Sequence, residues 1–391
     1  MSTQRISPTK TRGTGVSIEP YTISISPFVI EDLRERIGRA RWPDEIGGSG
    51  WRYGTNEEYL KQLCTHWANG FDWKEQEDQL NALHHFRATI DGINLHFVHE
   101  KGKGRKRVPL MLIHGWPDSF TRFLKMIPLL AAEGPDGISF DLVIPSIPGY
   151  GFSDRPGEAG MNFTRVAELF GRLMRELGYP QYMVHGGDLG SSIAEQLAIA
   201  YPEAVLGIHL LDVPYMHFYS LKPEELTPPE KKYIQAGQQW QMQEGAYGLL
   251  QSTKPQTLAY ALNDSPIGLA AWIIEKFYSW SDQPGDLEKV YTRDELLVNL
   301  TIYWATQTVG SAARIYYESM HTQLRQAKGR LDTPTAVCIP PRDMVPAPRE
   351  FAERFFNIMQ WTELGSGGHF VPMERPDVVA GDLFHFATKL W

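Results

Sequence analysis

The chain has 391 residues, enough for one large domain or two ordinary ones. Its 46 acidic and 38 basic residues give a net charge of −8, and because nucleic-acid binding needs clustered positive charge, the composition argues against a nucleic-acid partner. The 35 glycines and 27 prolines are scattered without a repeat, which excludes collagen-like and low-complexity chains.

Two cysteines, Cys64 and Cys338, occur without a CxxC pair. They predict neither a disulfide framework nor a cysteine-based zinc site, and they favour the cytoplasm. The longest apolar stretches, such as Val108–Ile113 and Gly268–Ile274, are far shorter than the roughly 18–20 residues that span a bilayer, so no transmembrane anchor is expected. The first eighteen residues are polar and predict a frayed terminus rather than a transit peptide.

Residues 1–105 predict helices followed by a hairpin. Tyr21–Ile25 has the pattern of a short strand, and Pro27–Ala40 places acids before bases, which suits the dipole of a helix. Two more helical segments precede two alternating stretches around the turn Asp91-Gly92, which is typical of a β-hairpin. The helices are expected at Asn56–Gly70 and Trp73–Leu83, and the hairpin strands at Phe86–Ile90 and Ile93–His99.

Between residues 106 and 213, apolar stretches of strand length alternate with helix-length segments. This alternation indicates an α/β fold with a mostly parallel sheet that is covered by helices on both faces. The expected strands are Val108–Ile113, Phe140–Pro145, Gln181–Val184 and Leu206–Asp212. The expected helices are Phe120–Ala132, Asn162–Leu177 and Ser191–Tyr201.

Residues 214–330 interrupt this alternation. They are rich in Tyr, Trp and Gln with helix-like spacing and lack a strand-like apolar run, so they predict an inserted helical lid. Strands return at Thr335–Ile339 and near Phe355–Trp361, and a helix over Asp377–Leu390 ends the chain. The α/β core is therefore expected in two parts, residues 106–213 and 331–391.

The segment Val184–Ser192 has the shape of a nucleophile elbow, in which small residues flank one reactive side chain at a sharp strand-to-helix turn. Asp188 holds the reactive position. A carboxylate can attack an electrophilic sp³ carbon and leave an alkyl ester, so the motif indicates epoxide opening or dehalogenation. Taken alone, the motif is equally consistent with Asp188 as the N-cap of the next helix.

The segment Ile113–Pro117 directly follows the first long apolar strand. In a fold of this kind, the oxyanion is bound by the backbone N–H of the residue after the nucleophile, here Leu189, and by an N–H from an earlier loop, here Trp116. Pro117 has no N–H. The side chain of Trp116 is also a candidate for the substrate pocket.

The loop Gly365–Phe370 contains His369, the candidate general base. It follows the nucleophile and the acid in the chain order expected of an α/β-hydrolase. Asp343, just past the strand at Thr335–Ile339, is the candidate that orients His369 and stabilises its imidazolium. Glu374 is the rival acid, and we expect it to be a structural carboxylate near a helix start.

Opening an epoxide also needs a donor to the developing alkoxide. A phenol suits this task, since it donates a hydrogen bond and its pKa lies near 10, far below that of an alkoxide. The lid contains many tyrosines, and composition does not choose among them.

Several separated motifs together resemble the α/β-hydrolase-fold epoxide hydrolases, in the microsomal branch with its juvenile-hormone and soluble fungal and bacterial relatives. The motifs are His114–Pro117, Pro148–Ser153, Gly186–Gly190, Gly367–Phe370, Thr253–Tyr260, Asn263–Leu269 and Arg314–Glu318. The resemblance runs from about Ile18 onward. It implies an α/β-hydrolase fold with a helical lid and an N-terminal extension that packs on the lid.

The resemblance also assigns roles. It implies Asp188 as nucleophile, His369 as base, Asp343 as its carboxylate, and Tyr247 and Tyr316 as donors to the epoxide oxygen. The adjacent Tyr317 leaves the register of the second tyrosine open. Microsomal members carry an N-terminal membrane anchor, and we expect none in this chain.

The sequence therefore predicts an enzyme that converts an epoxide and water to a vicinal diol without a cofactor or metal. Trp116, Trp240 and Tyr150 are the pocket candidates. A haloalkane dehalogenase is the alternative enzyme, although it commonly has Trp where this chain has Leu189. A non-catalytic protein that binds a small hydrophobic ligand is a further alternative. Detoxification and secondary metabolism fit the motifs equally well as biological roles. The aromatic lid is compatible with a homodimer.

Overall fold

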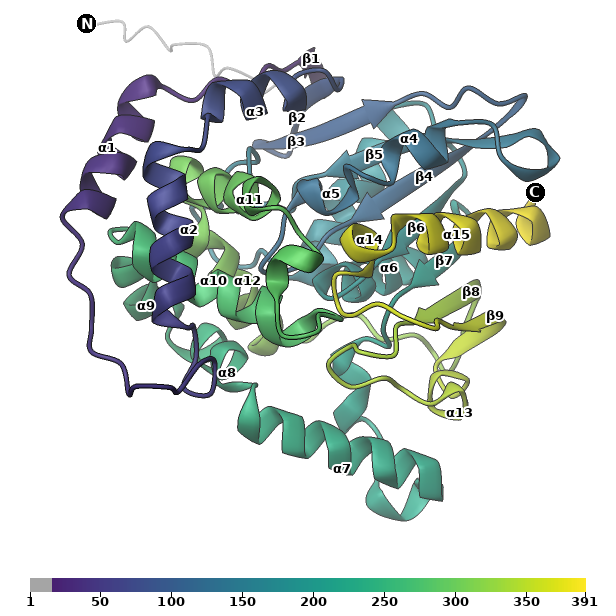
Figure 1. The fold of residues 1–391 in the computed structure, drawn as a ribbon. Helices are drawn as coiled ribbons and strands as arrows, with labels where there is room; N and C mark the ends of the chain where they lie inside the picture. Colours follow the sequence, from purple (N-terminus) through teal and green to yellow (C-terminus); the bar gives the residue numbers. More distant parts are fainter. Residues whose placement is uncertain (1–15) are drawn as a thin grey trace, which may run out of the picture.

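The structure, a computed structural model, describes residues 16–391. A nine-stranded sheet crosses the molecule with helices on both of its faces, and the lid helices α8–α12 lie together to one side of it (Figure 1). This confirms the predicted α/β fold with an inserted helical lid. The frayed terminus was predicted for the first eighteen residues. Residues 1–15 lie outside the described residues, whereas Ser17 and Ile18 belong to strand β1, so the prediction is wrong there.

The sheet has the strand order β1-β2-β3-β5-β4-β6-β7-β8-β9. The six strands from β5 to β9 in this order are parallel to one another, and β1, β2 and β3 extend the sheet in antiparallel fashion. Parallel strands bring their carboxyl ends to one edge, and in open α/β sheets that edge holds the site. The strands are β1 Ser17–Pro20, β2 His85–Ile90, β3 Ile93–Glu100, β4 Lys106–Ile113, β5 Ile138–Pro145, β6 Tyr182–Gly186, β7 Val205–Leu210, β8 Leu331–Ile339 and β9 Phe356–Glu363.

The strand predicted at Tyr21–Ile25 is wrong. The first strand lies earlier, at Ser17–Pro20, where it pairs with β2. The segment after it is held by side chains instead of by a strand partner, since the amide of Ile25 donates to the carboxylate of Glu77 at 2.7 Å. The hairpin prediction is confirmed, and its turn has positive φ at both Asp91 and Gly92, as a tight hairpin requires.

Of the four helices that the sequence predicts in the core, three agree with the structure and one does not. Phe120–Ala132 is not one helix but a short 3₁₀ turn, η1 (Phe120–Phe123), followed by α4 (Ile127–Ala131). Pro128 explains the break, because proline has no amide hydrogen and cannot continue a helix that began upstream. The other core helices are α5 Phe163–Glu176, α6 Leu189–Ala200, α13 Arg349–Ala352, α14 Val371–Glu374 and α15 Pro376–Leu390.

The lid contains only helices and short helical turns between residues 214 and 330, all of which the structure describes. Its helix α7 lies apart from α9–α12 at the lower edge of the molecule (Figure 1). The lid helices are α7 Pro228–Gln243, α8 Ala246–Thr253, α9 Pro255–Leu262, α10 Pro266–Trp280, α11 Arg293–Thr306 and α12 Val309–Met320.

The N-terminal helices α1 (Pro27–Gly38) and α2 (Glu57–Asn69) pack on the lid, as predicted, and α3 (Trp73–Leu80) leads back to the sheet (Figure 1). In the segment that precedes α2 in the chain, the indole of Trp51 stacks on the ring of Tyr278 on α10, with ring centroids 3.9 Å apart. These contacts fasten α10 and α11 from outside.

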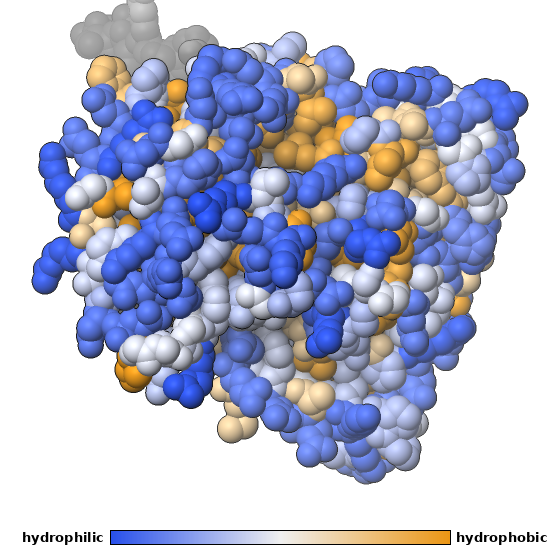
Figure 2. Space-filling model, in the orientation of Figure 1, coloured by the Kyte–Doolittle hydropathy of each residue, from blue (hydrophilic) through white to orange (hydrophobic). Residues whose placement is uncertain are grey.

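The molecular surface is mostly hydrophilic on the face drawn in Figure 2, with hydrophobic residues gathered toward the top of that view. Among residues 16–391, no helix combines the length and the apolar character that crossing a membrane requires.

Candidate active site

Asp188 lies at the sharp turn between β6 and α6. Its backbone has φ 58° and ψ −127°, a region that non-glycine residues rarely adopt. The turn also needs small neighbours, since a Cβ on Gly186 would lie 2.2 Å from the carbonyl oxygen of Gly190. A Cβ on Gly190 would in turn lie 2.2 Å from the carbonyl oxygen of Ile113 on β4. The small residues of the motif thus hold the Asp188 side chain above the sheet edge.

The Asp188 carboxylate is bound by backbone amides. Its Oδ1 accepts a hydrogen bond from the N–H of Trp116 at 2.8 Å, and the N–H of Leu189 also bonds to the carboxylate. The carboxylate can lie this close to the Trp116 loop only with glycine at position 115, because a Cβ on Gly115 would lie 2.3 Å from Oδ1 of Asp188. Burial raises the pKa of Asp188, but His369 and the two amides outweigh burial and lower it overall.

His369 lies between two carboxylates. Its Nδ1 is 2.8 Å from Oδ1 of Asp343, which follows β8, and its Nε2 is 3.5 Å from Oδ2 of Asp188. Burial lowers the pKa of His369, but Asp343 and Asp188 raise it to about 10. The imidazole is therefore protonated at neutral pH while Asp188 is ionised. The structure brings these three predicted residues together from β6, β8 and the C-terminal loop.

The main chain of His369 is held from several sides. Its N–H donates to the carbonyl oxygen of Trp280 in the lid at 2.7 Å, and Arg122 donates to its carbonyl oxygen at 2.6 Å. The carboxylate of Glu374 accepts from the amides on both sides of His369, at 2.9 and 3.1 Å. Glu374, the rival acid in the sequence, thus fixes the loop from the end of the short helix α14.

Two acidic residues of this site are ones that the sequence analysis missed. Asp212 follows β7, and its Oδ1 accepts from the amide of Asp188 and from the hydroxyl of Ser191, both at 2.8 Å. Burial and the neighbouring Asp343 raise the pKa of Asp212 to about 7. Asp118 forms a buried ion pair with Arg122 at 2.5 Å, which joins the Trp116 loop to the His369 loop. The sequence signal that could have identified Asp212 and Asp118 is their position at the end of a predicted strand or in the segment that follows one.

The two lid tyrosines face each other across the site. Tyr247 on α8 and Tyr316 on α12 have ring centroids 6.2 Å apart, and both line the same cavity as Asp188. The Trp116 indole stacks on the Tyr247 ring at 4.8 Å. The Tyr316 hydroxyl is buried and has no hydrogen-bond partner among residues 16–391. Tyr317 instead turns outward, 39% exposed.

The cavity has a volume of about 330 Å³ and a mostly apolar lining. Trp240 lines it, as predicted for a pocket residue. Trp116 and Tyr150 are fully buried and are not among its lining residues; the Tyr150 hydroxyl donates to the carbonyl oxygen of Ala312. The charged side chains of the lining are Asp188 and Asp212, so the cavity offers no cation to an anionic substrate.

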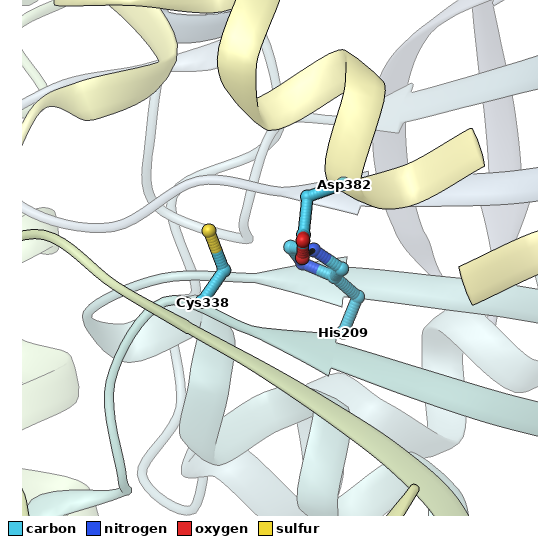
Figure 3. A group of neighbouring side chains, drawn as sticks. All are labelled: His209, Cys338 and Asp382. Carbon is cyan, nitrogen blue, oxygen red and sulfur yellow. Dashed lines mark hydrogen bonds and ion pairs between the residues drawn. The ribbon is translucent and has the colours of Figure 1, made fainter. Parts of the chain in front are cut away.

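One buried group has side chains of the kind that bind metals, namely His209 on β7, Cys338 on β8 and Asp382 on α15 (Figure 3). None of the three lines the cavity that holds Asp188. Asp382 reaches from α15 to His209 on β7, with Nε2 to Oδ2 at 2.9 Å. The other His209 nitrogen bonds to His185 at 2.9 Å, and burial raises the pKa of the Cys338 thiol. Hydrogen bonds therefore already occupy both His209 nitrogens, which fits a polar core network better than a metal site.

Two family models together match residues 18–376 of this chain. A family model described as "Epoxide hydrolase N terminus" matches residues 18–123, and one described as "alpha/beta hydrolase fold" matches residues 108–376. Epoxide hydrolase 1 of Sus scrofa is 35% identical over 409 residues, covering 96% of this chain and 89% of that protein.

Two solved structures are similar over nearly the whole chain. The juvenile hormone epoxide hydrolase from the silkworm Bombyx mori has a TM-score of 0.85 at 31% identity, covering 96% of this chain and 95% of that chain. The Aspergillus niger epoxide hydrolase has a TM-score of 0.83 at 29% identity, covering 96% of this chain and 97% of that chain.

Proposed function

This chain belongs to the α/β-hydrolase-fold epoxide hydrolases of the microsomal and juvenile-hormone type, and from that membership we propose that it forms vicinal diols through a covalent ester on Asp188. The observation that carries the proposal is the position of the Asp188 carboxylate. It lies between His369 on one side and the cavity lined by Tyr247 and Tyr316 on the other.

In the first half-reaction, Oδ2 of Asp188 attacks a ring carbon and the carbon–oxygen bond of the epoxide breaks. Oδ2 is the attacking atom because Oδ1 already accepts the Trp116 N–H and becomes the carbonyl oxygen of the ester. Tyr247 and Tyr316 donate hydrogen bonds to the ring oxygen, and one phenol gives its proton to the alkoxide. The product is a hydroxyalkyl ester of Asp188.

Ester formation then prepares the base. It removes the negative charge of Asp188, which is one of the causes that raise the pKa of His369. His369 therefore loses its proton more readily, and this proton returns the phenolate to a phenol. The result is a neutral imidazole, oriented by Asp343, at the moment when a base is needed.

In the second half-reaction, His369 takes a proton from water, and the hydroxide attacks Cγ of the ester. The negative charge that develops on Oδ1 is stabilised by the N–H groups of Trp116 and Leu189. The intermediate collapses with Oδ2 leaving in the diol, which takes the proton from His369. Asp188 keeps the oxygen atom from water and returns its acid proton to His369, so the cycle closes without a cofactor.

A single turnover in ¹⁸O-water, with enzyme in excess over styrene oxide, tests this proposal. Unlabelled diol together with ¹⁸O in the peptide that contains Asp188 would establish the ester route. Labelled diol with an unlabelled peptide would mean direct attack by water and would overturn it. The Asp188→Ala variant is the control, since it should form no diol while ligand affinity stays largely intact.

A further inference from the structure

Tyr247 faces a chemical difficulty in the proposed first half-reaction. Burial and the nearby Asp188 carboxylate both raise the pKa of its phenol. A phenol with a raised pKa is a weaker hydrogen-bond donor toward a developing alkoxide, and Tyr247 therefore needs a compensating positive charge.

A buried cation lies beside this ring. Lys276, on α10, is only 6% exposed, although lysine is rarely buried unless it is paired. Its Nζ lies over the Tyr247 ring, 5.1 Å from the centroid, and 5.6 Å from the centroid of Trp280. Both distances fall within the range of a cation–π interaction, which is strengthened where water is excluded.

Two carboxylates lie near the amine of Lys276. Nζ forms an ion pair with Glu275, the residue before it. Glu244, at the end of α7, lies close enough that Lys276 opposes the rise in the pKa of that carboxyl caused by burial and by Glu275. Lys276 thus has acidic groups on one side and the aromatic rings of the site on the other. An ion pair alone would not require the side chain to be buried against these rings.

We propose that Lys276 is a positioning residue for Tyr247. The positive charge of Lys276 withdraws electron density from the phenol ring and makes the Tyr247 hydroxyl a stronger donor to the oxygen of the opening epoxide. The inference rests on the proposed function, because it assigns Lys276 to the first half-reaction alone. Among residues 16–391, Lys276 forms no hydrogen bond or ion pair with His369, so hydrolysis of the ester should depend on it little.

The test separates the two half-reactions with rapid mixing of styrene oxide and enzyme. Formation and decay of the ester are followed by the fluorescence of Trp116 and Trp280, which lie against Tyr247. Lys276→Met removes the charge and keeps the length of the side chain. It should slow ester formation about tenfold, corresponding to about 1.4 kcal/mol, and leave ester hydrolysis within about twofold.

Four further variants make the result specific. Lys276→Arg keeps the charge and should retain most of the rate of ester formation. Lys289→Met, which removes an exposed lid lysine, should change neither step. In a Tyr247→Phe background, Lys276→Met should have little further effect, since the hydroxyl on which it acts is gone. Lys276→Gln replaces the Met variant if the latter fails to fold, as judged by circular dichroism.

The Lys276→Arg rescue and the Tyr247→Phe background give readouts that a loss of packing alone would not move. Equal slowing of both half-reactions, or an undiminished effect in the Tyr247→Phe background, would overturn the inference and leave the proposed function intact. A wild-type protein that forms no diol would overturn the proposed function itself.

Discussion

Nε2 of His369 lies 3.5 Å from Oδ2 of Asp188, so in the proposed mechanism the base of the second half-reaction is paired with the nucleophile of the first. While Asp188 is a carboxylate, this pairing raises the pKa of His369 and favours its protonated form. Esterification of Asp188 would end the pairing. In the proposed mechanism, this one contact therefore sets the order of the two half-reactions.

His369→Gln should trap the ester. The variant keeps the nucleophile and the lid phenols, so styrene oxide should still alkylate Asp188, but water activation is lost and hydrolysis should slow by about 10²–10⁴-fold. Mass analysis of the Asp188 peptide after mixing with substrate should show the adduct. His321→Gln, which changes an exposed histidine on the lid, is the control. Absence of an adduct in the His369 variant would contradict the assigned order of steps.

Tyr247→Phe and Tyr316→Phe should each slow ester formation by about 10–100-fold, since each removes one donor to the ring oxygen. Tyr317→Phe is the matched control, because that ring is turned away from the cavity and stacks on His321. Rapid-mixing kinetics with one epoxide would compare all three. If Tyr317→Phe were the damaging change, the register of the second tyrosine would be off by one.

The pairing of His369 should make stability fall at alkaline pH. Its folded pKa is raised to about 10, above an unfolded value near 6.5. The contribution to the free energy of unfolding is therefore complete below pH 6.5 and is lost as pH rises through 10. Urea denaturation at pH 6, 8 and 10 should show this decline, and His369→Gln should show a smaller one. An equal slope in both proteins would contradict the pairing.

Gly115→Ala should damage the nucleophile without unfolding the protein. The new Cβ would lie 2.3 Å from Oδ1 of Asp188, so the carboxylate must shift away from the Trp116 amide. Ester formation should slow by about 10²-fold or more, since a misplacement of about 1 Å can cost that much. Gly381→Ala in α15 has open space around the new Cβ and should keep full activity. A fully active Gly115→Ala variant would show that Asp188 does not need that hydrogen bond.

Local pattern was enough to predict the α/β alternation and the helical lid. The role of Asp188 needed the other motifs as well, because the segment Val184–Ser192 alone is equally consistent with a helix N-cap. The sequence did not resolve Tyr316 from Tyr317. Adjacent residues on a helix point about 100° apart, and which of them faces the cavity depends on how α12 packs against α8. The structure places Tyr316 inward.

Contacts made across the chain were beyond the reach of sequence patterns. Asp212 resembles any acid that ends a strand until β7 is placed beside β6. Lys276 reads as an ordinary charge in a lid helix until α10 brings it over Tyr247. The strand predicted near residue 23 failed for a similar reason, since distant side chains of α3 and its end bind those amides.

The hydrogen bond from the amide of His369 to the carbonyl oxygen of Trp280 has a practical consequence for protein engineering. The lid insertion and the C-terminal loop share this backbone contact at His369, so a lid transplanted from a relative would have to present a carbonyl oxygen at the same place. Chimeras should therefore exchange the lid and residues 365–374 as one cassette, and libraries that aim to change selectivity should leave the segment 280–282 untouched.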